Sequence, residues 1–393
     1  MKQLRFFCLL CCSLCLFSCE EETITPPEET INGTILLEEY MIPHGSTIPN
    51  QEGEKYQIYV REKVKDSTLL NASIAGKVVL LVHATITPSI SSYDLPYEDY
   101  SIMESLADKG LDVFTFDFIG YGKSSYPAPM DNPCNLSPDD QKALGLTPCE
   151  ADYPFTMTTG FSELDEIDTV VEFIKRTRNV SKVHIYGLSL GGIRSLNYAM
   201  AHPENIEQIG VQGVARYFSF DLTPSTIPAN GFPMKITTEN VMLDRLNDDL
   251  FTDTQRDIQI NPTVWQTVKE QDSLGQSWGS GGSRYPSLQL YGFQRSDLEQ
   301  LSLPCLILSG ENDRILNPLL PLRSDLGLSL YNDMLTSPKK IHLTVENTGH
   351  VMMYDYGARY MREVMVEWFL SGSVNTRLEG VGTINTSGEF SWE

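Results

Sequence analysis

Short apolar runs alternate with helical patterns from about residue 76 onward. Residues 77–84 (KVVLLVHA) are a short continuous apolar run, and residues 111–118 (LDVFTFDF), 182–187 (KVHIYG) and 303–310 (LPCLILSG) are further strand-like segments rich in apolar residues. Such runs are typical of strands that are buried on both faces of a sheet. Between them, stretches such as 160–179 place apolar residues at helical spacing. The alternation predicts an α/β fold, with a mostly parallel sheet and helices on both faces.

Other segments depart from this alternation. Residues 34–42 and 55–64 are strand-like with no helix between them, which predicts an antiparallel edge. Two segments are interpreted as insertions: a Pro-rich loop at 124–159 and a cap at 217–300 that combines helical pieces with a glycine-rich stretch. The predicted core therefore has a first part at 35–216 and a second part at 301–370, followed by a polar tail at 371–393 without a clear period.

The first residues have a pattern of their own. Lys2 and Arg5 precede an apolar stretch that ends at Phe17, which is too short and too early for an ordinary membrane span. Residues 1–18 are therefore predicted to be a secretory signal. The ending LFSC resembles the lipobox of bacterial lipoproteins, which implies cleavage before Cys19 and a lipid on that cysteine. Residues 19–34 would then be a tether on the bacterial cell envelope, on its periplasmic or cell-surface face. The alternative is a plain signal peptide with incidental cysteines.

The charge of the chain limits its partners. The 393 residues include 52 Asp and Glu against 29 Lys and Arg, a net charge of −23. An acidic surface repels phosphates, so nucleic acid is excluded as an expected partner.

Two cysteines flank a polar, Pro-containing loop. Cys134 and Cys149 have a spacing that suits a loop-closing disulfide in an oxidising compartment. A metal site is less favoured because no His or paired Cys lies nearby. Cys305, inside an apolar run, is expected to be a buried free thiol.

Two segments fit the pattern G-x-S-x-G, namely GLSLG around Ser189 and GQSWG around Ser277. A nucleophilic serine in this pattern needs a strand before it and a helix after it, so that a sharp turn exposes its hydroxyl. Ser189 has both, whereas Ser277 follows a helix-like piece and leads into a glycine-rich stretch. Ser189 is therefore predicted to be a nucleophile, and the segment around Ser277 a flexible cap loop.

A serine nucleophile needs a base and an acid, which follow it along the chain in this kind of fold. Of the histidines after Ser189, His202 is expected to cap a helix and His342 to lie within a strand. His350 lies in a loop directly after that strand, and we expect it to be the base. The acid is expected after the preceding strand, where Asp313 fits better than Glu311. Backbone amides are expected to bind the oxyanion, one of them from Leu190.

Five segments together resemble the α/β-hydrolase fold: LLVHAT, DFIGYGKSS, GLSLGG, SGENDRI and NTGHVMMY, within about residues 76–370. The resemblance implies a cap-bearing, esterase- or lipase-like serine hydrolase with Ser189, Asp313 and His350 as its triad. It also implies that Leu190 and Thr85 form the oxyanion hole. One departure is Ala84, where the family usually has glycine, and this puts the position of the Thr85 amide in doubt.

The expected activity is cleavage of a small-molecule carboxylic ester through an acyl-serine intermediate, with no metal or organic cofactor. Two alternatives stay open. The first is an aminopeptidase or amidase on the same scaffold, which acidic residues in the cap would favour. The second is a surface-binding lipoprotein that has lost catalysis. The sequence does not indicate the substrate or the oligomeric state.

Overall fold

The computed structural model describes residues 33–214, 227–228, 231–248, 256–287, 292–313 and 326–393. The predicted signal segment, Cys19 and nearly all of the predicted tether lie outside the described residues, as do parts of the cap at 217–300.

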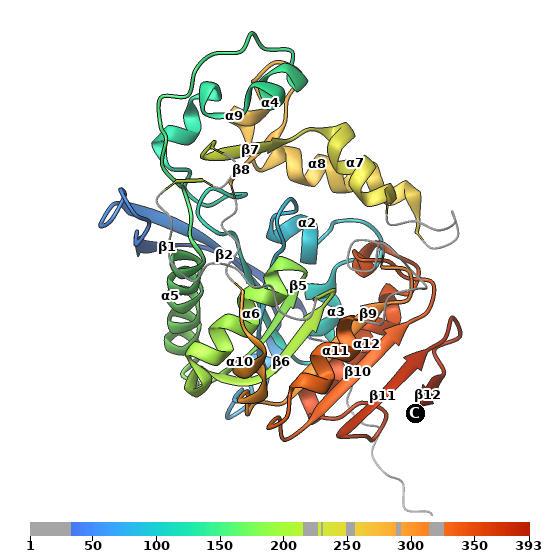
Figure 1. The fold of residues 1–393 in the computed structure, drawn as a ribbon. Coiled ribbons are helices and arrows are strands. Elements are labelled where there is room, and N and C mark those ends of the chain that lie inside the picture. The colour runs from blue at the N-terminus through green and yellow to red at the C-terminus, as the bar shows by residue number, and fades with distance from the viewer. Residues whose placement is uncertain (1–32, 215–226, 229–230, 249–255, 288–291, 314–325) are drawn as a thin grey trace, which may run out of the picture. The chain divides into compact units, whose positions relative to one another are not determined.

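The main sheet has the strand order β1-β2-β4-β3-β5-β6-β9-β10-β11-β12, and a second sheet pairs β7 with β8. From β4 to β11 every neighbouring pair in the main sheet is parallel. Antiparallel pairs occur at its two edges. The predicted mostly parallel sheet and its antiparallel β1–β2 edge are confirmed (Figure 1).

The strands have the following bounds: β1 Ile35–Gly45, β2 Lys55–Lys65, β3 Val78–Val82, β4 Asp112–Phe116, β5 Val183–Leu188, β6 Ile206–Gln212, β7 Met234–Thr237, β8 Ser283–Pro286, β9 Cys305–Gly310, β10 Lys340–Val345, β11 Glu379–Ile384 and β12 Phe390–Trp392. The α-helices have the following bounds: α1 Asp66–Leu69, α2 Ser89–Tyr93, α3 Ile102–Asp108, α4 Pro138–Ala143, α5 Gly160–Arg178, α6 Leu190–Ala201, α7 Glu239–Asp248, α8 Asn261–Glu270, α9 Ser273–Gln276, α10 Arg295–Glu299, α11 Leu326–Asp333 and α12 Ala358–Ser371. Single 3₁₀ turns have the bounds η1 Ala128–Asp131, η2 Pro133–Asn135, η3 Pro203–Asn205, η4 Ile258–Ile260 and η5 Met352–Tyr354.

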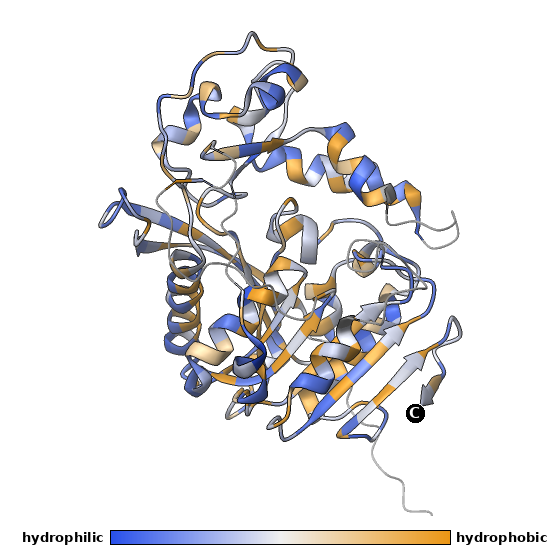
Figure 2. Ribbon diagram, viewed as in Figure 1, coloured by the Kyte–Doolittle hydropathy of each residue, from blue (hydrophilic) through white to orange (hydrophobic). Residues whose placement is uncertain are grey.

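The apolar strands supply two hydrophobic cores, one on each face of the main sheet. Along β3, Val78, Leu80 and Val82 belong to the core that includes residues of α5 and α6, whereas Val79 and Leu81 belong to the core that includes residues of α3 and α12. Successive side chains of a strand point to opposite faces, so a strand covered on both sides must be apolar throughout. Figure 2 shows this as hydrophobic colour along the central strands.

The two insertions pack against each other and form a third, smaller core. Met130, Leu136 and Met157 from residues 124–159 contact Met234 and Trp278 from the cap, together with Leu144 and Ile236. The Ser280 amide donates to the Leu144 carbonyl at 2.9 Å. We call this unit, made of residues 124–159 with β7, α9 and β8, the cap lobe. The segment GQSWG around Ser277 is not the flexible cap loop that the sequence predicted, because it ends the short helix α9 and its glycines pack against Asp272 and the Leu144 carbonyl.

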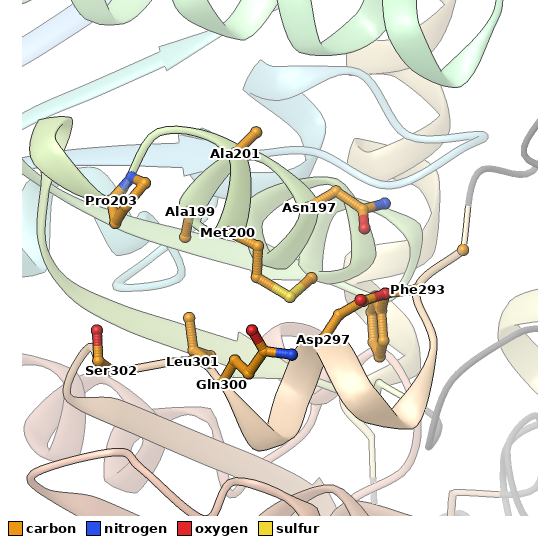
Figure 3. A pocket seen from close by; sticks show the side chains of 11 residues that line it. Asn197, Ala199, Met200, Ala201, Pro203, Phe293, Asp297, Gln300, Leu301 and Ser302 are labelled. Atoms are coloured by element: carbon orange, nitrogen blue, oxygen red, sulfur yellow. The ribbon is translucent and has the colours of Figure 1, made fainter.

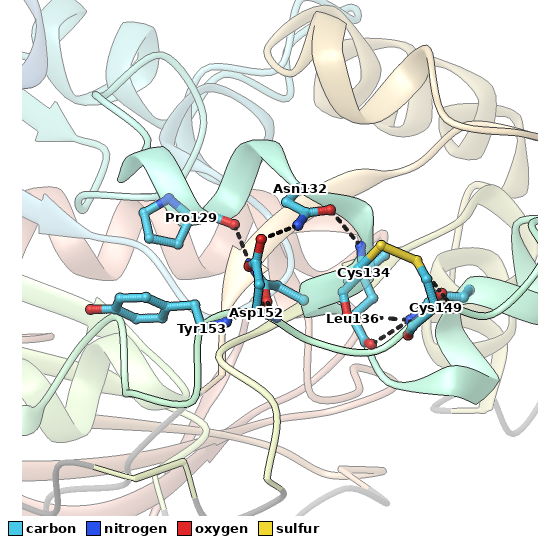
Figure 4. The surroundings of a disulfide bond; sticks show 9 residues. Pro129, Asn132, Cys134, Leu136, Cys149, Asp152 and Tyr153 are labelled. Carbon is cyan, nitrogen blue, oxygen red and sulfur yellow. Dashed lines mark hydrogen bonds between the residues drawn. A yellow bond between two sulfur atoms is a disulfide. The ribbon is translucent and has the colours of Figure 1, made fainter.

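A disulfide joins Cys134 to Cys149 within the cap lobe. Figure 4 shows the polar network around it. The Gln141 side chain accepts from the Cys149 amide at 2.8 Å and donates to the Leu136 carbonyl at 2.9 Å. Asn135 accepts from the Asp152 amide at 3.0 Å. The loop is thus held by side chain to backbone hydrogen bonds as well as by the covalent link.

The other part of the cap packs on the main body. Met242 and Leu246 of α7, with Val264 and Val268 of α8, belong to the core that includes residues of α3 and α12. Met352 belongs to the same core. The cap insertion is therefore divided between two cores.

The sequence predicted that the core ends at residue 370 and that a polar tail follows. The tail at 371–393 instead contributes β11 and β12 to the main sheet. Both strands are short, and β11 carries two glycines, so neither strand has the apolar period that predicts a strand. Within the described residues, no helix combines the length and the apolar character that crossing a bilayer requires.

Candidate active site

Ser189 lies between β5 and α6 in a backbone conformation that side chains rarely adopt. Its φ is 53° and its ψ is −120°, and it is the residue directly before the first residue of α6. Such strain persists only where the surroundings impose it, and it clusters at functional sites. The amide of Ser189 donates to the Gln212 carbonyl at 2.7 Å, which ties the turn to the end of β6. This is the strand–turn–helix geometry that the sequence predicted.

The glycines around Ser189 allow backbones to approach that any side chain would separate. A Cβ on Gly187 would lie 2.2 Å from the Gly191 carbonyl oxygen. A Cβ on Gly191 would lie 2.1 Å from the Val82 carbonyl oxygen and 2.6 Å from that of His83. Real Cβ contacts are never this short, so both positions require glycine. As a result, α6 begins directly against the end of β3.

His350 and Asp313 form a buried pair at the ends of two neighbouring strands. His350 Nδ1 lies 2.9 Å from Asp313 Oδ2, and both side chains are almost fully buried. Asp313 follows β9 and His350 follows β10, so the carboxyl ends of parallel strands bring them together. The geometry favours Asp313 over Glu311, because the Glu311 carboxylate instead accepts from the Asn347 amide at 2.9 Å.

The end of β6 connects Ser189 with His350. Gln212 accepts from the Ser189 amide through its carbonyl and donates to the His350 carbonyl through its side chain at 3.1 Å. The next residue, Gly213, has a φ of +60°, and a Cβ there would lie 3.0 Å from both Cε1 and Nδ1 of His350. The imidazole ring therefore packs over Gly213, close to the backbone that holds Ser189.

The loop after β3 presents an amide with no acceptor in the described part of the protein. Arg194 Nη1 donates to the Ala84 carbonyl at 3.3 Å and His83 Nδ1 lies 2.7 Å from the same oxygen. Since the carbonyl and amide of one trans peptide point in opposite directions, the Thr85 amide faces away from Arg194. The Leu190 amide, at the first position of α6, likewise has no acceptor among the described residues. Ala84 does not adopt a positive φ, so alanine is tolerated here in place of the glycine that the family usually has.

His83 itself has a structural role. It is fully buried, and burial together with Arg194 lowers the pKa of its ring to about 3. The neutral ring accepts from the Phe118 amide through Nε2 at 3.2 Å. Asp117 is also structural, since its carboxylate accepts from the amides of Ser89 and Lys123 and burial raises its pKa.

Of the other candidates, His202 and His342 lie where the sequence predicted them, whereas Ser277 ends a helix and does not lie in a flexible loop. Ser277 is exposed at the end of α9, where its hydroxyl donates to the Leu274 carbonyl. His202 follows the last residue of α6, and His342 lies within β10 against the Ser309 hydroxyl at 3.0 Å.

One buried ion pair that supports the site was not predicted from the sequence. Arg194 Nε donates to Glu163 Oε2 at 2.8 Å, and both side chains are nearly fully buried. This pair joins α5 to α6 and places the guanidinium beneath the loop after β3. The sequence does contain a signal for this pair, because Arg194 is the one charged residue of α6.

A separate hollow of about 510 Å³ lies beside the second half of α6. Its lining includes Asn197, Met200, Phe293 and Gln300 but not Ser189, Asp313 or His350 (Figure 3). It therefore belongs to a different place on the protein.

The sequence profile of the family described as alpha/beta hydrolase fold matches residues 77–355. No curated protein sequence gives a significant match. Among solved structures, the chain is similar to a thioesterase domain from the curacin biosynthetic pathway, with 14% identity, a TM-score of 0.50, and 86% of this chain and 100% of that domain covered.

It is also similar to the naproxen esterase (carboxylesterase NP) of Bacillus subtilis, with 16% identity, a TM-score of 0.50 and coverage of 86% and 93%. The meta-cleavage product hydrolase of Pseudomonas fluorescens IP01 has 16% identity, a TM-score of 0.50 and coverage of 81% and 96%. At these identities the likeness concerns the fold alone. The profile match, which spans more than half of the chain, shows that this protein belongs to the alpha/beta hydrolase fold family.

Proposed function

We propose that the protein is a serine hydrolase that cleaves a carboxylic ester through an acyl-enzyme intermediate. One observation supports this above the others. Ser189 is held at positive φ between β5 and α6, and the hydrogen-bonded His350–Asp313 pair follows β10 and β9 of the same sheet. The three residues occur in the chain order serine, acid, histidine that this kind of fold uses.

Each residue then has a defined step. His350 removes the proton of the Ser189 hydroxyl as the oxygen attacks the ester carbonyl, and it returns that proton to the leaving alcohol. Asp313 orients the imidazole and stabilises its positive charge through the 2.9 Å contact to Nδ1. The acyl group stays on Ser189 until a water molecule, activated by the same histidine, releases the acid.

The amides of Leu190 and Thr85 are proposed to bind the oxyanion. Gly191, which adjoins Leu190, packs directly against the carbonyl of His83, so the two amides belong to segments in close contact. An amide without a protein acceptor can donate to the negative charge that develops on the substrate oxygen.

A fluorophosphonate probe tests this proposal, because it forms a covalent bond with an activated serine. We expect labelling of the peptide that contains Ser189, together with hydrolysis of short-chain acyl esters. Absence of both label and hydrolysis would favour the binding lipoprotein. Faster hydrolysis of aminoacyl amides than of esters would favour the aminopeptidase.

We also propose that the protein is exported and carries a lipid on Cys19. The charged start, the short apolar stretch and the LFSC ending support this. One acyl chain binds membranes only marginally, so stable anchoring needs several chains on that cysteine. In a bacterial host, the wild type is expected to partition with membranes and take up labelled fatty acid, whereas Cys19→Ala is not. Continued lipid labelling of Cys19→Ala would contradict the proposal.

A further inference from the structure

A buried ion pair joins the cap insertion to the loop that carries His350. Arg256 belongs to the cap, and Asp355 lies five residues after His350. Arg256 Nε donates to Asp355 Oδ1 at 2.9 Å, and both side chains are fully buried. The two residues also form an isolated antiparallel bridge, so their backbones lie side by side.

The second oxygen of Asp355 contacts the backbone directly before His350. Asp355 Oδ2 accepts from the Gly349 amide at 2.7 Å. On its other side, the loop is pressed against the end of β9, where a Cβ on Gly310 would lie 2.3 Å from the Gly349 carbonyl oxygen. Because Gly349 is held from both sides, Asp355 helps to set the point from which His350 projects.

Arg256 contacts the cap helix as well. Its Nη1 donates to the carbonyl of Leu246 in α7. Leu246 and Met242 of the same helix share a core with Met352 and Met353, which lie two and three residues after His350. One guanidinium thus joins the backbone of the cap helix to the carboxylate that holds the histidine loop.

The stability of the fold gives no sufficient reason for this arrangement. Removing two charges from water costs several kcal/mol per ion, and well-packed apolar residues often replace a buried pair without loss. The hydrogen bonds of a guanidinium and a carboxylate are directional and hold their partners at defined positions. Apolar side chains make no such directional contacts.

We propose that Arg256 and Asp355 are positioning residues that make the placement of His350 depend on the packing of α7 against the core that contains Met352 and Met353. This inference rests on the proposed function, which gives His350 its role as the base. When α7 is packed in this position, Arg256 donates both to the Leu246 carbonyl and to the Asp355 carboxylate. The carboxylate in turn accepts from the Gly349 amide. When α7 shifts, the Gly349 amide loses a fixed acceptor, and the imidazole is no longer held above Gly213.

A second buried pair in the cap offers a matched control. Arg284 Nη2 lies 2.8 Å from Asp272 Oδ1, and both side chains are nearly fully buried. Arg284 also donates to Asp131 and to the Met130 carbonyl. Within the described residues, these hydrogen-bond partners belong to the two insertions. The Arg284 pair therefore stabilises the cap lobe without contacting the histidine loop.

The kinetic test compares the double variants R256M/D355N and R284M/D272N, each of which removes both charges of its pair. In the second variant the Asp131 carboxylate loses its Arg284 partner but is more than half exposed to solvent. For a short-chain acyl ester, R256M/D355N is expected to lower kcat by about 10-fold with little change in KM, because a small misplacement of a catalytic group is costly. Arg256→Lys, which keeps the charge, is expected to lie between this variant and the wild type. R284M/D272N is expected to keep kcat within about 2-fold of wild type, since the histidine loop is untouched.

Hydrogen exchange provides a readout that needs no substrate. The Gly349 amide is expected to exchange at least about 10-fold faster in R256M/D355N than in the wild type and at the wild-type rate in R284M/D272N. Wild-type kcat in R256M/D355N, or an equal loss in both double variants, would overturn the proposal. If the wild type neither hydrolyses esters nor reacts with fluorophosphonate, the proposed function fails. If Gly349 also exchanges at the same rate in R256M/D355N as in the wild type, the coupling between α7 and the histidine loop is overturned as well.

Discussion

The segments GLSLG and GQSWG share one pattern and have different structures. In the first, Ser189 adopts φ 53° between a buried strand and a helix. In the second, Ser277 adopts φ −78° and ψ −10° as the residue that ends the short helix α9. The glycines differ in the same way. Gly187 and Gly191 bring a strand and a helix into contact, whereas Gly275 and Gly279 pack against Asp272 and the Leu144 carbonyl inside the cap lobe.

The comparison shows that the pattern has no chemical meaning by itself. Glycine removes a side chain, and what then approaches depends on the elements on either side. Where a strand of the central sheet precedes and a helix follows, the result is a strained serine at the carboxyl edge of the sheet. Where a short helix precedes and one strand of a two-stranded antiparallel sheet follows, the result is a compact turn with the serine in solvent.

The largest effect on kcat is expected from removal of the Ser189 hydroxyl. Ser189→Ala is expected to lower kcat for an ester by about 10⁴- to 10⁶-fold, because members of a triad act as a unit. Ser277→Ala is expected to leave kcat within about 2-fold, since the exposed hydroxyl contacts only its own turn. Steady-state kinetics and the site of fluorophosphonate labelling measure both. A label on Ser277 would reverse the comparison.

The second prediction concerns the acid. Asp313→Asn is expected to lower kcat by about 10⁴-fold, because an amide no longer holds the imidazole in the tautomer that accepts the serine proton. Glu311→Gln is the matched control and removes one charge from the same loop. Its kcat is expected to stay within about 3-fold of wild type, since the amide oxygen still accepts from Asn347. Equal losses in the two variants would contradict the assignment of Asp313.

The third prediction compares two glycines with positive φ, Gly213 and Gly279. Gly213→Ala is expected to lower kcat by about 10- to 100-fold, because the methyl group would displace the His350 ring. Gly279→Ala places its methyl group against the Leu144 carbonyl, so we expect a lower melting temperature and a smaller change in kcat. Kinetics and thermal unfolding on the same samples separate the two effects. A larger kcat loss in Gly279→Ala would show that the cap lobe controls the chemical step.

The smallest effect on chemistry is expected from the disulfide of the cap lobe. Closing a loop of about 15 residues stabilises it by roughly 3 kcal/mol in the chain-entropy model. The double variant C134S/C149S is therefore expected to be more sensitive to proteolysis at 134–149 and to keep kcat for a short-chain ester within about 2-fold. Limited proteolysis and kinetics measure these outcomes. A loss of kcat as large as that of Gly213→Ala would link the cap lobe to the His350 loop.

The sequence by itself determined the central sheet and its helices, and it predicted which serine lies between a strand and a helix. These features depend on local patterns, because continuous apolar runs, helical spacing and a glycine-flanked serine each act within about twenty residues. The order of Ser189, Asp313 and His350 along the chain also pointed to the correct strand ends. Glu311 could not be rejected on that basis, since two neighbouring loop residues differ only in which way they face.

Only the tertiary structure decided the contacts between distant segments. The two insertions share one small core, the polar tail adds two strands to the sheet, and Arg256 meets Asp355 across ninety-nine positions of sequence. No local period encodes such pairings, because each depends on whether packing elsewhere brings the partners together. A buried ion pair is the clearest case, since Arg256 and Asp355 look like surface residues in the sequence, and their burial is stable only because each one is present for the other.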